Sequence, residues 1–183
     1  MIYIPGQKIS KLILTKDIKG LKRERRDAKK NKGHSKKQKE RWAKWLSSFP
    51  DSVVVFASFE SETFLPAAAA AELLLGLEST NRPFFVVLNF PKGTDTEAEL
   101  AKCTPPGFAE RTKVRGVVHT GWVQQQHILH HRAVGCFVNH AGLSSVVEGQ
   151  GLVASCRLVL LPMKGDQYLN ASPPSSPSPS SKS

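Results

Sequence analysis

Cysteine is scarce in this chain of 183 residues, and its three copies, Cys103, Cys136 and Cys156, form no pair with a recognisable spacing. An odd number of scattered cysteines excludes a disulfide framework and favours a reducing compartment. Long apolar runs are also missing, because the longest, residues 64–77, contains a proline and a glutamate and is too short to cross a bilayer. Residues 1–14 do not have the pattern of a signal peptide. We therefore expect a cytoplasmic protein without a membrane span.

Acidic residues are scarce in only one part of the chain. Sixteen of the 26 basic residues but only four of the 15 acidic ones lie in Met1–Trp45, so this segment carries a formal charge of +12 and the remainder carries −1. The sequence pI of about 9.8 therefore reflects an N-terminal arm and does not indicate that the rest binds nucleic acid. The arm alone could bind phosphate backbones non-specifically, but it has no interleaved aromatic residues before Trp42. A solvated charge run or a gene-model artefact is the favoured interpretation, and nucleic acid is not an expected partner.

Composition divides the chain into three zones. Residues 1–39 form the basic arm, which has too few apolar residues in Lys22–Lys39 to bury a surface and is expected to be disordered or a solvated helix. Residues 171–183 form a tail of serine and proline that is expected to be disordered. Between them, residues 40–170 are long and apolar enough for one core.

The middle zone alternates two kinds of segment. Continuous apolar, β-branched runs predict strands at Ser52–Ser58, Pro83–Asn89, Gly116–Thr120, Val134–Asn139 and Arg157–Leu161. The segments between them predict helices at Pro66–Leu77, Pro106–Thr112, Gln125–His131 and Gly142–Val153, with a polar loop at Lys92–Thr104. This alternation predicts an α/β fold with a parallel sheet covered by helices on both faces. Ligands of such sheets bind beyond the carboxyl ends of the strands.

The segment after the fourth predicted strand suits an anion. A turn at Gly142 leads into a helix start with two hydroxyls, Ser144 and Ser145, and His140 ends the strand. Unpaired helix amides, the helix dipole and these donors would together hold a diphosphate. The alternative is that Ser145 and Glu148 form a capping box that only starts a helix, and the local pattern leaves both interpretations open.

Other strand ends carry further candidates. Trp122 could stack on a flat base, or it could be an ordinary half-buried core residue. Asp166 and Gln167 pair acceptors with donors that suit vicinal sugar hydroxyls, although such residues are also common in surface loops. Three histidines at helical spacing lack a carboxylate or cysteine to complete a metal site, so no metal is expected. Their positions are His127, His130 and His131.

In this order, the pieces resemble the signature box of plant secondary-product glycosyltransferases, enzymes that use UDP-sugars. The matching box starts with Trp-Val-Gln-Gln at Trp122 and ends with Asp-Gln at Asp166. Upstream segments also match, and they are Trp42–Leu46, Phe56–Ser61 and Pro106–Arg111. The opening of the box and the run Gly165–Asn170 are similar to the branch that extends the sugar of flavonoid and anthocyanidin glycosides. The resemblance covers Glu40–Asn170.

The resemblance implies a Rossmann-like domain, the C-terminal, donor-binding half of a GT-B glycosyltransferase. It implies that the uracil is held by Trp122 and the backbone of Val123, and the ribose by Gln125 and Glu148. It implies that the diphosphate is held by Ser61, His140, Gly142, Ser144 and Ser145, and the donor sugar by Asp166 and Gln167. The implied donor substrate is a UDP-sugar, the implied acceptor of the full-length family is a small flavonoid-type molecule, and no cofactor or metal is implied.

The resemblance also has gaps. We expect the chain to be truncated at both ends relative to the family, without the half that carries the catalytic histidine, so no catalytic residue is assigned and the chain is expected to be inactive alone. Glu60 stands where the family usually has glycine, and relative to the family the chain has two extra residues near Gly149–Gly151. A non-catalytic UDP-binding module or a degenerate gene product is therefore the alternative to a transferase.

Overall fold

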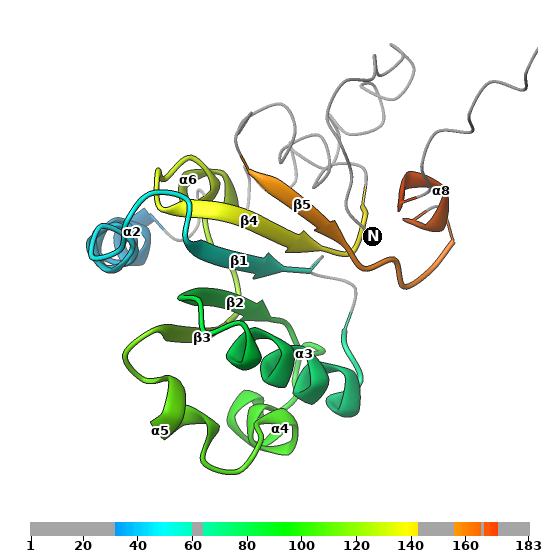
Figure 1. Ribbon diagram of the computed structural model, residues 1–183. Coiled ribbons are helices and arrows are strands. Elements are labelled where there is room, and N and C mark those ends of the chain that lie inside the picture. Colours follow the sequence, from blue (N-terminus) through cyan, green and yellow to red (C-terminus); the bar gives the residue numbers. More distant parts are fainter. Residues whose placement is uncertain (1–31, 60–63, 143–155, 166, 172–183) are drawn as a thin grey trace, which may run out of the picture.

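The computed structural model describes residues 32–59, 64–142, 156–165 and 167–171, which contain a five-stranded sheet (Figure 1). Its strands are β1 (Val54–Ser58), β2 (Phe84–Leu88), β3 (Gly116–Thr120), β4 (Val134–Asn139) and β5 (Arg157–Leu160). The order across the sheet is β3-β2-β1-β4-β5, and all four pairings are parallel. The predicted α/β fold with a parallel sheet is confirmed.

Helices cover both faces of this sheet (Figure 1). They are α2 (Lys32–Leu46), α3 (Ala67–Ser79), α4 (Thr96–Cys103), α5 (Phe108–Thr112), α6 (Gln125–Leu129) and α8 (Gln167–Ala171). One buried cluster joins α2 and α6 to Phe56, Phe85 and Phe137 of the sheet. A second cluster, on the other face, joins α3, α4 and α5 to Phe84 and Val86. Neighbouring side chains of β2 thus supply both cores, as expected for a strand buried on both sides.

Two elements differ from the sequence-based expectation. The segment predicted as a polar loop contains α4, which Asp95 starts by accepting hydrogen bonds from the amides of Glu97 at 3.0 Å and Ala98 at 3.3 Å. A carboxylate cap of this kind satisfies amides that a helix leaves unpaired, so a polar segment can be helical. Helix α2 crosses the expected boundary between residues 39 and 40. The predicted helix Gly142–Val153 lies outside the described residues except for its first position, and so does the tail beyond residue 171.

Helix α6 connects the part of the sheet on one side of β1 to the part on the other side. After β3, which lies at one edge, α6 crosses over β1 and contacts both β1 and β4. The loop that precedes α6 therefore runs from the end of β3 toward the middle of the sheet. Because the strands are parallel, this loop and the segments after β1, β4 and β5 all lie at the same carboxyl edge.

Gly135 permits a close approach between β4 and the turn before β1. A Cβ built on Gly135 would collide with the backbone of Ser52, which cannot move aside as a side chain can. Ser52 is fixed there because its amide donates to the carbonyl of Arg132 at 2.9 Å. The position therefore excludes any side chain.

We predict that Gly135→Ala lowers the free energy of unfolding by about 1–3 kcal/mol, the usual cost of forcing extra atoms into a packed site. Gly76→Ala is the matched control, since Gly76 lies in α3 with no atom within 4 Å of an added Cβ. That change should raise stability by about 0.5–1 kcal/mol, because alanine is the better helix former. Urea unfolding followed by circular dichroism measures both, and equal stability of the two variants would contradict the prediction.

Candidate functional site

The described part of the carboxyl edge brings several of the expected binding residues to one side of the sheet. Trp122 and Val123 follow β3, Gln125 begins α6, and His140 and Gly142 follow β4. Gln167 begins α8, a few residues after β5. The other expected residues, which are Ser61, Ser144, Ser145, Glu148 and Asp166, lie outside the described residues.

Trp122 projects from a loop that is fixed to the core on one side. The indole is 43% exposed, while the next residue, Val123, is 8% exposed and belongs to the α2–α6 core. The amide of Gln125 donates to the carbonyl of Val123 at 3.0 Å, which starts α6 directly after the loop. Trp122 is more exposed than the buried residues of the core beside it, although more than half of its surface is covered. A partly exposed ring on an anchored loop is the arrangement that a stacking platform requires.

His119, which the sequence analysis did not single out, is bonded to the loop of Trp122. Its ring forms a hydrogen bond with the backbone of Trp122, and its Nε2 lies 3.3 Å from Nε2 of Gln38 in α2. Because an amide nitrogen only donates, Nε2 of His119 accepts, and the ring proton is on Nδ1, where it donates to the Trp122 carbonyl. The ring also packs edge-on against Trp42, with centroids 5.3 Å apart. Helix α2 is thereby linked to the exposed indole.

The neutral form of His119 is the one that makes both hydrogen bonds. Burial lowers its pKa from 6.5, and the nearby Arg41 guanidinium lowers it further, while the bond to the Trp122 backbone opposes these effects. If Nε2 of His119 also carried a proton, it would face the amide nitrogen of Gln38. Both groups would then be donors, and no hydrogen bond could form between them. The neutral ring is therefore the form that links Gln38 of α2 to the loop of Trp122.

The segment after β4 is a tightly built turn. The ring of His140 is 1% exposed, and a Cβ on Gly142 would collide with that ring. Ala141 between them has φ +59°, in the left-handed region, and is fully buried. Asn139 holds the turn by accepting the amide of Ala141 at 2.9 Å, while its own buried Nδ2 has no hydrogen-bond partner among the described residues. Gly142 is thus needed for the close approach of the His140 ring to the backbone.

Helix α8 contacts the two neighbouring loops through side chains one turn apart. Oε1 of Gln167, 3% exposed, accepts the amides of Met163 at 2.9 Å and Lys164 at 3.1 Å in the loop after β5. Nδ2 of Asn170 donates to the carbonyl of Ala141 at 2.9 Å in the turn after β4. The expected sugar-binding residue Gln167 is therefore also a structural part of its loop.

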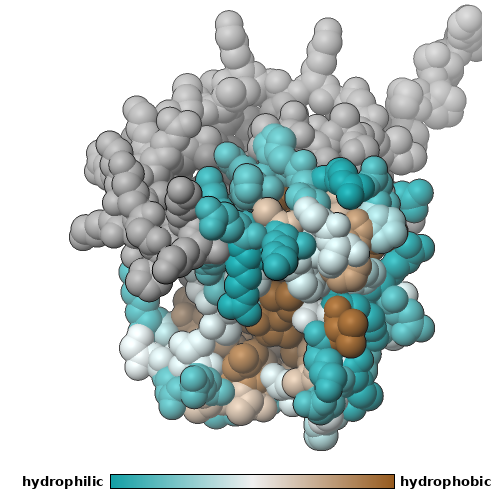
Figure 2. Space-filling view, turned by 90° about the vertical axis from the view of Figure 1, so that its left-hand side faces the viewer, coloured by the Kyte–Doolittle hydropathy of each residue, from teal (hydrophilic) through white to brown (hydrophobic). Residues whose placement is uncertain are grey.

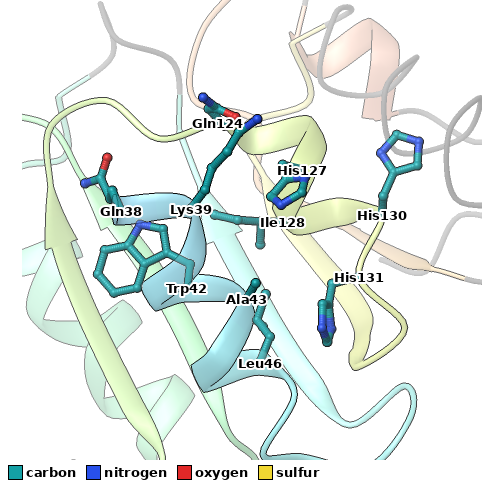
Figure 3. Close-up of a pocket in the computed structure, with 10 residues that line it drawn as sticks. All are labelled: Gln38, Lys39, Trp42, Ala43, Leu46, Gln124, His127, Ile128, His130 and His131. Carbon is teal, nitrogen blue, oxygen red and sulfur yellow. The ribbon is translucent and has the colours of Figure 1, made fainter. Parts of the chain in front are cut away.

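A hollow of about 210 Å³ lies away from this edge, between α2 and α6 (Figure 3). Trp42, Ala43 and Leu46 of α2 face Ile128 of α6 across it. The face of the molecule on this side shows apolar surface framed by hydrophilic residues (Figure 2). The hollow reaches the loop of Trp122 only at Gln124.

Two of the histidines around this hollow, His130 and His131, lie within hydrogen-bond distance of nearby backbone groups. No group of three potential ligands is close enough to hold a metal within the residues that the structure describes. Nδ1 of His131 accepts the amide of Ala133 at 3.2 Å, and Nδ1 of His130 lies 2.6 Å from the carbonyl of Gln126. These contacts are local and hold the end of α6 against the start of β4.

The three cysteines are free thiols. Burial raises the pKa of Cys103 and Cys136, and it raises the pKa of Cys156 to about 12. Thiols that stay protonated are poor nucleophiles, so the described residues hold no activated cysteine. Within the same residues, no helix is long and apolar enough to pass through a bilayer.

Sequence reasoning missed the three residues that hold the loops: His119, Asn139 and Asn170. Each forms a hydrogen bond between its side chain and the backbone of a segment that follows a strand. The only available signals were a histidine near the end of an apolar strand and an asparagine one helical turn after Gln167. Neither signal identifies a partner in another part of the chain.

Comparison with known proteins adds a family match. The model of the family described as "UDP-glucoronosyl and UDP-glucosyl transferase" matches residues 30–174. An anthocyanidin-3-O-glucoside rhamnosyltransferase of Petunia hybrida is 56% identical over 137 residues, which are 75% of this chain and 28% of that protein. A cyanidin 3-O-galactoside 2''-O-xylosyltransferase of Actinidia chinensis var. chinensis is 48% identical over 130 residues, or 71% of this chain and 27% of that protein. The chain thus spans less than a third of the length of these relatives.

Solved structures with the same fold are glycosyltransferases. A UDP-glucose:anthocyanidin 3-O-glucosyltransferase in complex with UDP superposes with a TM-score of 0.62 and 32% identity, over 71% of this chain and 27% of that one. A transferase of Siraitia grosvenorii in complex with UDP superposes with a TM-score of 0.64 and 31% identity, over 76% and 32% of the two chains. The described fold is therefore that of one part of a GT-B enzyme.

We predict that His119→Phe flattens the dependence of stability on pH between 7.5 and 5.5. Because the pKa of His119 is lowered from 6.5 in the folded state, the unfolded chain takes up the proton first as the pH falls. The contribution of His119 is thus present above pH 6.5 and is lost as the pH falls below it. Phenylalanine removes this proton uptake and can keep the ring contact with Trp42.

Urea unfolding at several pH values measures this slope. Burial also lowers the pKa of His131, so the variant keeps part of the slope. Val114→Ala, at a position that is 81% exposed and has no titratable side chain, is the control and should leave the slope as in the unmodified chain. An equal slope for His119→Phe and the unmodified chain would refute the assignment.

Proposed function

We propose, because this chain belongs to the UDP-glucoronosyl and UDP-glucosyl transferase family, that its carboxyl-edge site binds a UDP-sugar and serves as the donor-binding part of a glycosyltransferase. The observation that carries the proposal is the exposed Trp122 on an anchored loop, at the same edge as the buried turn of His140 and Gly142. We further propose residues 40–170, with the rest of α2, as the binding unit. Residues 1–31 and 172–183 are proposed to lie outside it.

The nucleoside is proposed to bind at the end of β3. The indole of Trp122 offers a face for the uracil ring, and stacking on an aromatic ring contributes about 1–3 kcal/mol per base. The backbone of Val123 lies beside it, held by the buried side chain of that residue. Gln125, at the start of α6, and Glu148 are proposed to bind the ribose hydroxyls.

The diphosphate is proposed to bind at the end of β4. Gly142 has no side chain of its own, and the ring of His140 lies directly against its backbone. Ser61, Ser144 and Ser145 are proposed as hydroxyl donors to the phosphate oxygens. Nδ2 of Asn139, buried and without a partner among the described residues, is a further donor that a bound anion would satisfy.

The donor sugar is proposed to bind at the end of β5, through Asp166 and Gln167. Because Oε1 of Gln167 accepts two backbone amides, its amide nitrogen is the group directed to the ligand. It can only donate, so it would contact an oxygen of a sugar hydroxyl. The carboxylate of Asp166 would accept from a neighbouring hydroxyl.

The proposed reaction is an inverting transfer without metal, in which an acceptor hydroxyl attacks the anomeric carbon and UDP leaves. The turn after β4 would stabilise the charge that develops on the diphosphate. The base that deprotonates the acceptor is proposed to come from a part of the enzyme that this chain does not span. The names of the relatives suggest an anthocyanidin or flavonoid glycoside as the acceptor. The cytoplasm is the proposed location, in keeping with the three free cysteines.

We predict that the chain binds UDP and that Trp122→Ala weakens binding at least tenfold, with Trp122→Phe in between. The stacking energy of a base is worth one to two factors of ten in affinity. Isothermal titration calorimetry measures the constants, and Val114→Ala, at a position that is 81% exposed, is the control. The proposal fails if UDP at millimolar concentration gives no heat with the unmodified chain.

We also predict that this chain by itself transfers no sugar from a UDP-sugar to a flavonoid glycoside, because no residue in it is assigned as the base. Product analysis by liquid chromatography after long incubation measures this outcome. Turnover by the purified chain, abolished by Trp122→Ala, would overturn the division of roles. In that case UDP-sugar binding would stand and the chain would contain its own base.

A further inference from the structure

We propose that Asn170 is a positioning residue for the diphosphate end of the site, and this inference rests on the proposed function. Asn170 touches no proposed ligand atom. It acts through Ala141, whose carbonyl accepts a hydrogen bond from Nδ2 of Asn170 at 2.9 Å. The two residues are 29 positions apart, so the bond joins the turn after β4 to a helix that follows β5.

Ala141 adopts a conformation that alanine avoids. Its φ of +59° lies in the left-handed region, where the Cβ crowds the following carbonyl at a cost of about 1–2 kcal/mol. A residue stays in such a conformation only when its surroundings fix it. Because Ala141 is fully buried, water cannot fix it, and its backbone groups need partners from the protein.

Two asparagine side chains supply those partners. Oδ1 of Asn139 accepts the amide of Ala141 at 2.9 Å, and Nδ2 of Asn170 donates to the carbonyl of the same residue at 2.9 Å. Asn139 is the last residue of β4, so its bond ties the turn to its own strand. Asn170 belongs to α8, so its bond ties the turn to an element that follows β5.

The turn determines where the backbone groups beyond it lie. Gly142 follows Ala141 directly, and its backbone is already so close to the ring of His140 that no Cβ fits. A change of φ at Ala141 would rotate Gly142 away from the ring. The proposed diphosphate contacts on either side of Ala141, His140 and Gly142, would then lose their present arrangement.

The same helix fixes the sugar end of the site. Gln167, three residues before Asn170, accepts two amides of the loop after β5. Residues three apart on a helix lie on the same side. Helix α8 therefore joins the turn after β4 and the loop after β5 into one unit. The side chain of Asn170 supplies its bond to the turn after β4.

The test compares two ligands in one variant. Asn170→Leu keeps approximately the shape of the side chain and removes the donor without adding charge. We expect its affinity for UDP to fall about tenfold, equivalent to about 1.4 kcal/mol, and its affinity for uridine to stay within twofold of that of the unmodified chain. Uridine reports on Trp122, which lies at the other end of the proposed site. Asn170→Ser is the second variant in case leucine prevents folding, and circular dichroism checks the fold of each.

A second substitution that restores UDP affinity distinguishes a positioning role of Asn170 from a general contribution to stability. Glycine takes a positive φ without steric cost, so Ala141→Gly should restore most of the UDP affinity lost in Asn170→Leu. Arg115→Met is the matched control at the opposite edge of the sheet. It removes side-chain bonds to the carbonyls of Glu78 at 3.0 Å and Arg82 at 3.2 Å, and should lower stability without changing the ratio of UDP to uridine affinity.

Two results would overturn the inference and leave the proposed function intact. One is unchanged UDP affinity in Asn170→Leu, and the other is a parallel loss of UDP and uridine that Ala141→Gly does not restore. Hydrogen exchange without ligand gives an independent reading, since the Ala141 amide should lose protection in Asn170→Leu, and full protection would also contradict the inference. If the unmodified chain binds neither ligand, the proposed function fails and the inference with it.

Discussion

The parallel direction of all five strands is the constraint on which the site depends. It brings segments that are far apart in the sequence to one edge. Beyond the strand ends, these segments are not joined by the hydrogen-bond ladder of the sheet. The sheet is rigid because aromatic residues fill its core, with Phe56 stacked on Phe137 at 5.3 Å and Trp42 packed edge-on against Phe85 at 4.8 Å. Trp42 also lies against the ring of His119, so the core reaches directly to the loop of the exposed Trp122.

Loops at the edge of a sheet have no ladder partners, and their backbone groups must be satisfied in another way. Here the same solution occurs at three strand ends, because a side chain bonds to the backbone of the loop. His119 does so after β3, Asn170 after β4 and Gln167 after β5. His119 and Asn170 contact no proposed ligand, yet their bonds hold loops whose residues are proposed to do so.

Patterns within single segments were sufficient to predict the fold. β3 and β4 begin and end where the β-branched, apolar runs predicted. For β4, which is buried on both faces, such a run is the expected pattern. Helix α4 was missed because its sequence is polar and was interpreted as a loop. The helix begins there because Asp95 caps its first amides. For the site, sequence indicated Trp122, His140, Gly142 and Gln167 as residues at strand ends, but not the asparagines that shape the turn. Their role depends on partners up to 29 residues away, and no local pattern contains that information.

The central claim is that one ligand bridges the loop of Trp122 and the turn at Gly142. Nuclear magnetic resonance of the isotope-labelled chain tests it, with the indole resonance of Trp122 and the amide resonance of Gly142 followed during a titration with UDP. The account predicts that both resonances shift with one dissociation constant, and that uridine shifts the indole alone. Movement of neither resonance, or of each with a different constant for UDP, would contradict a single site at this edge.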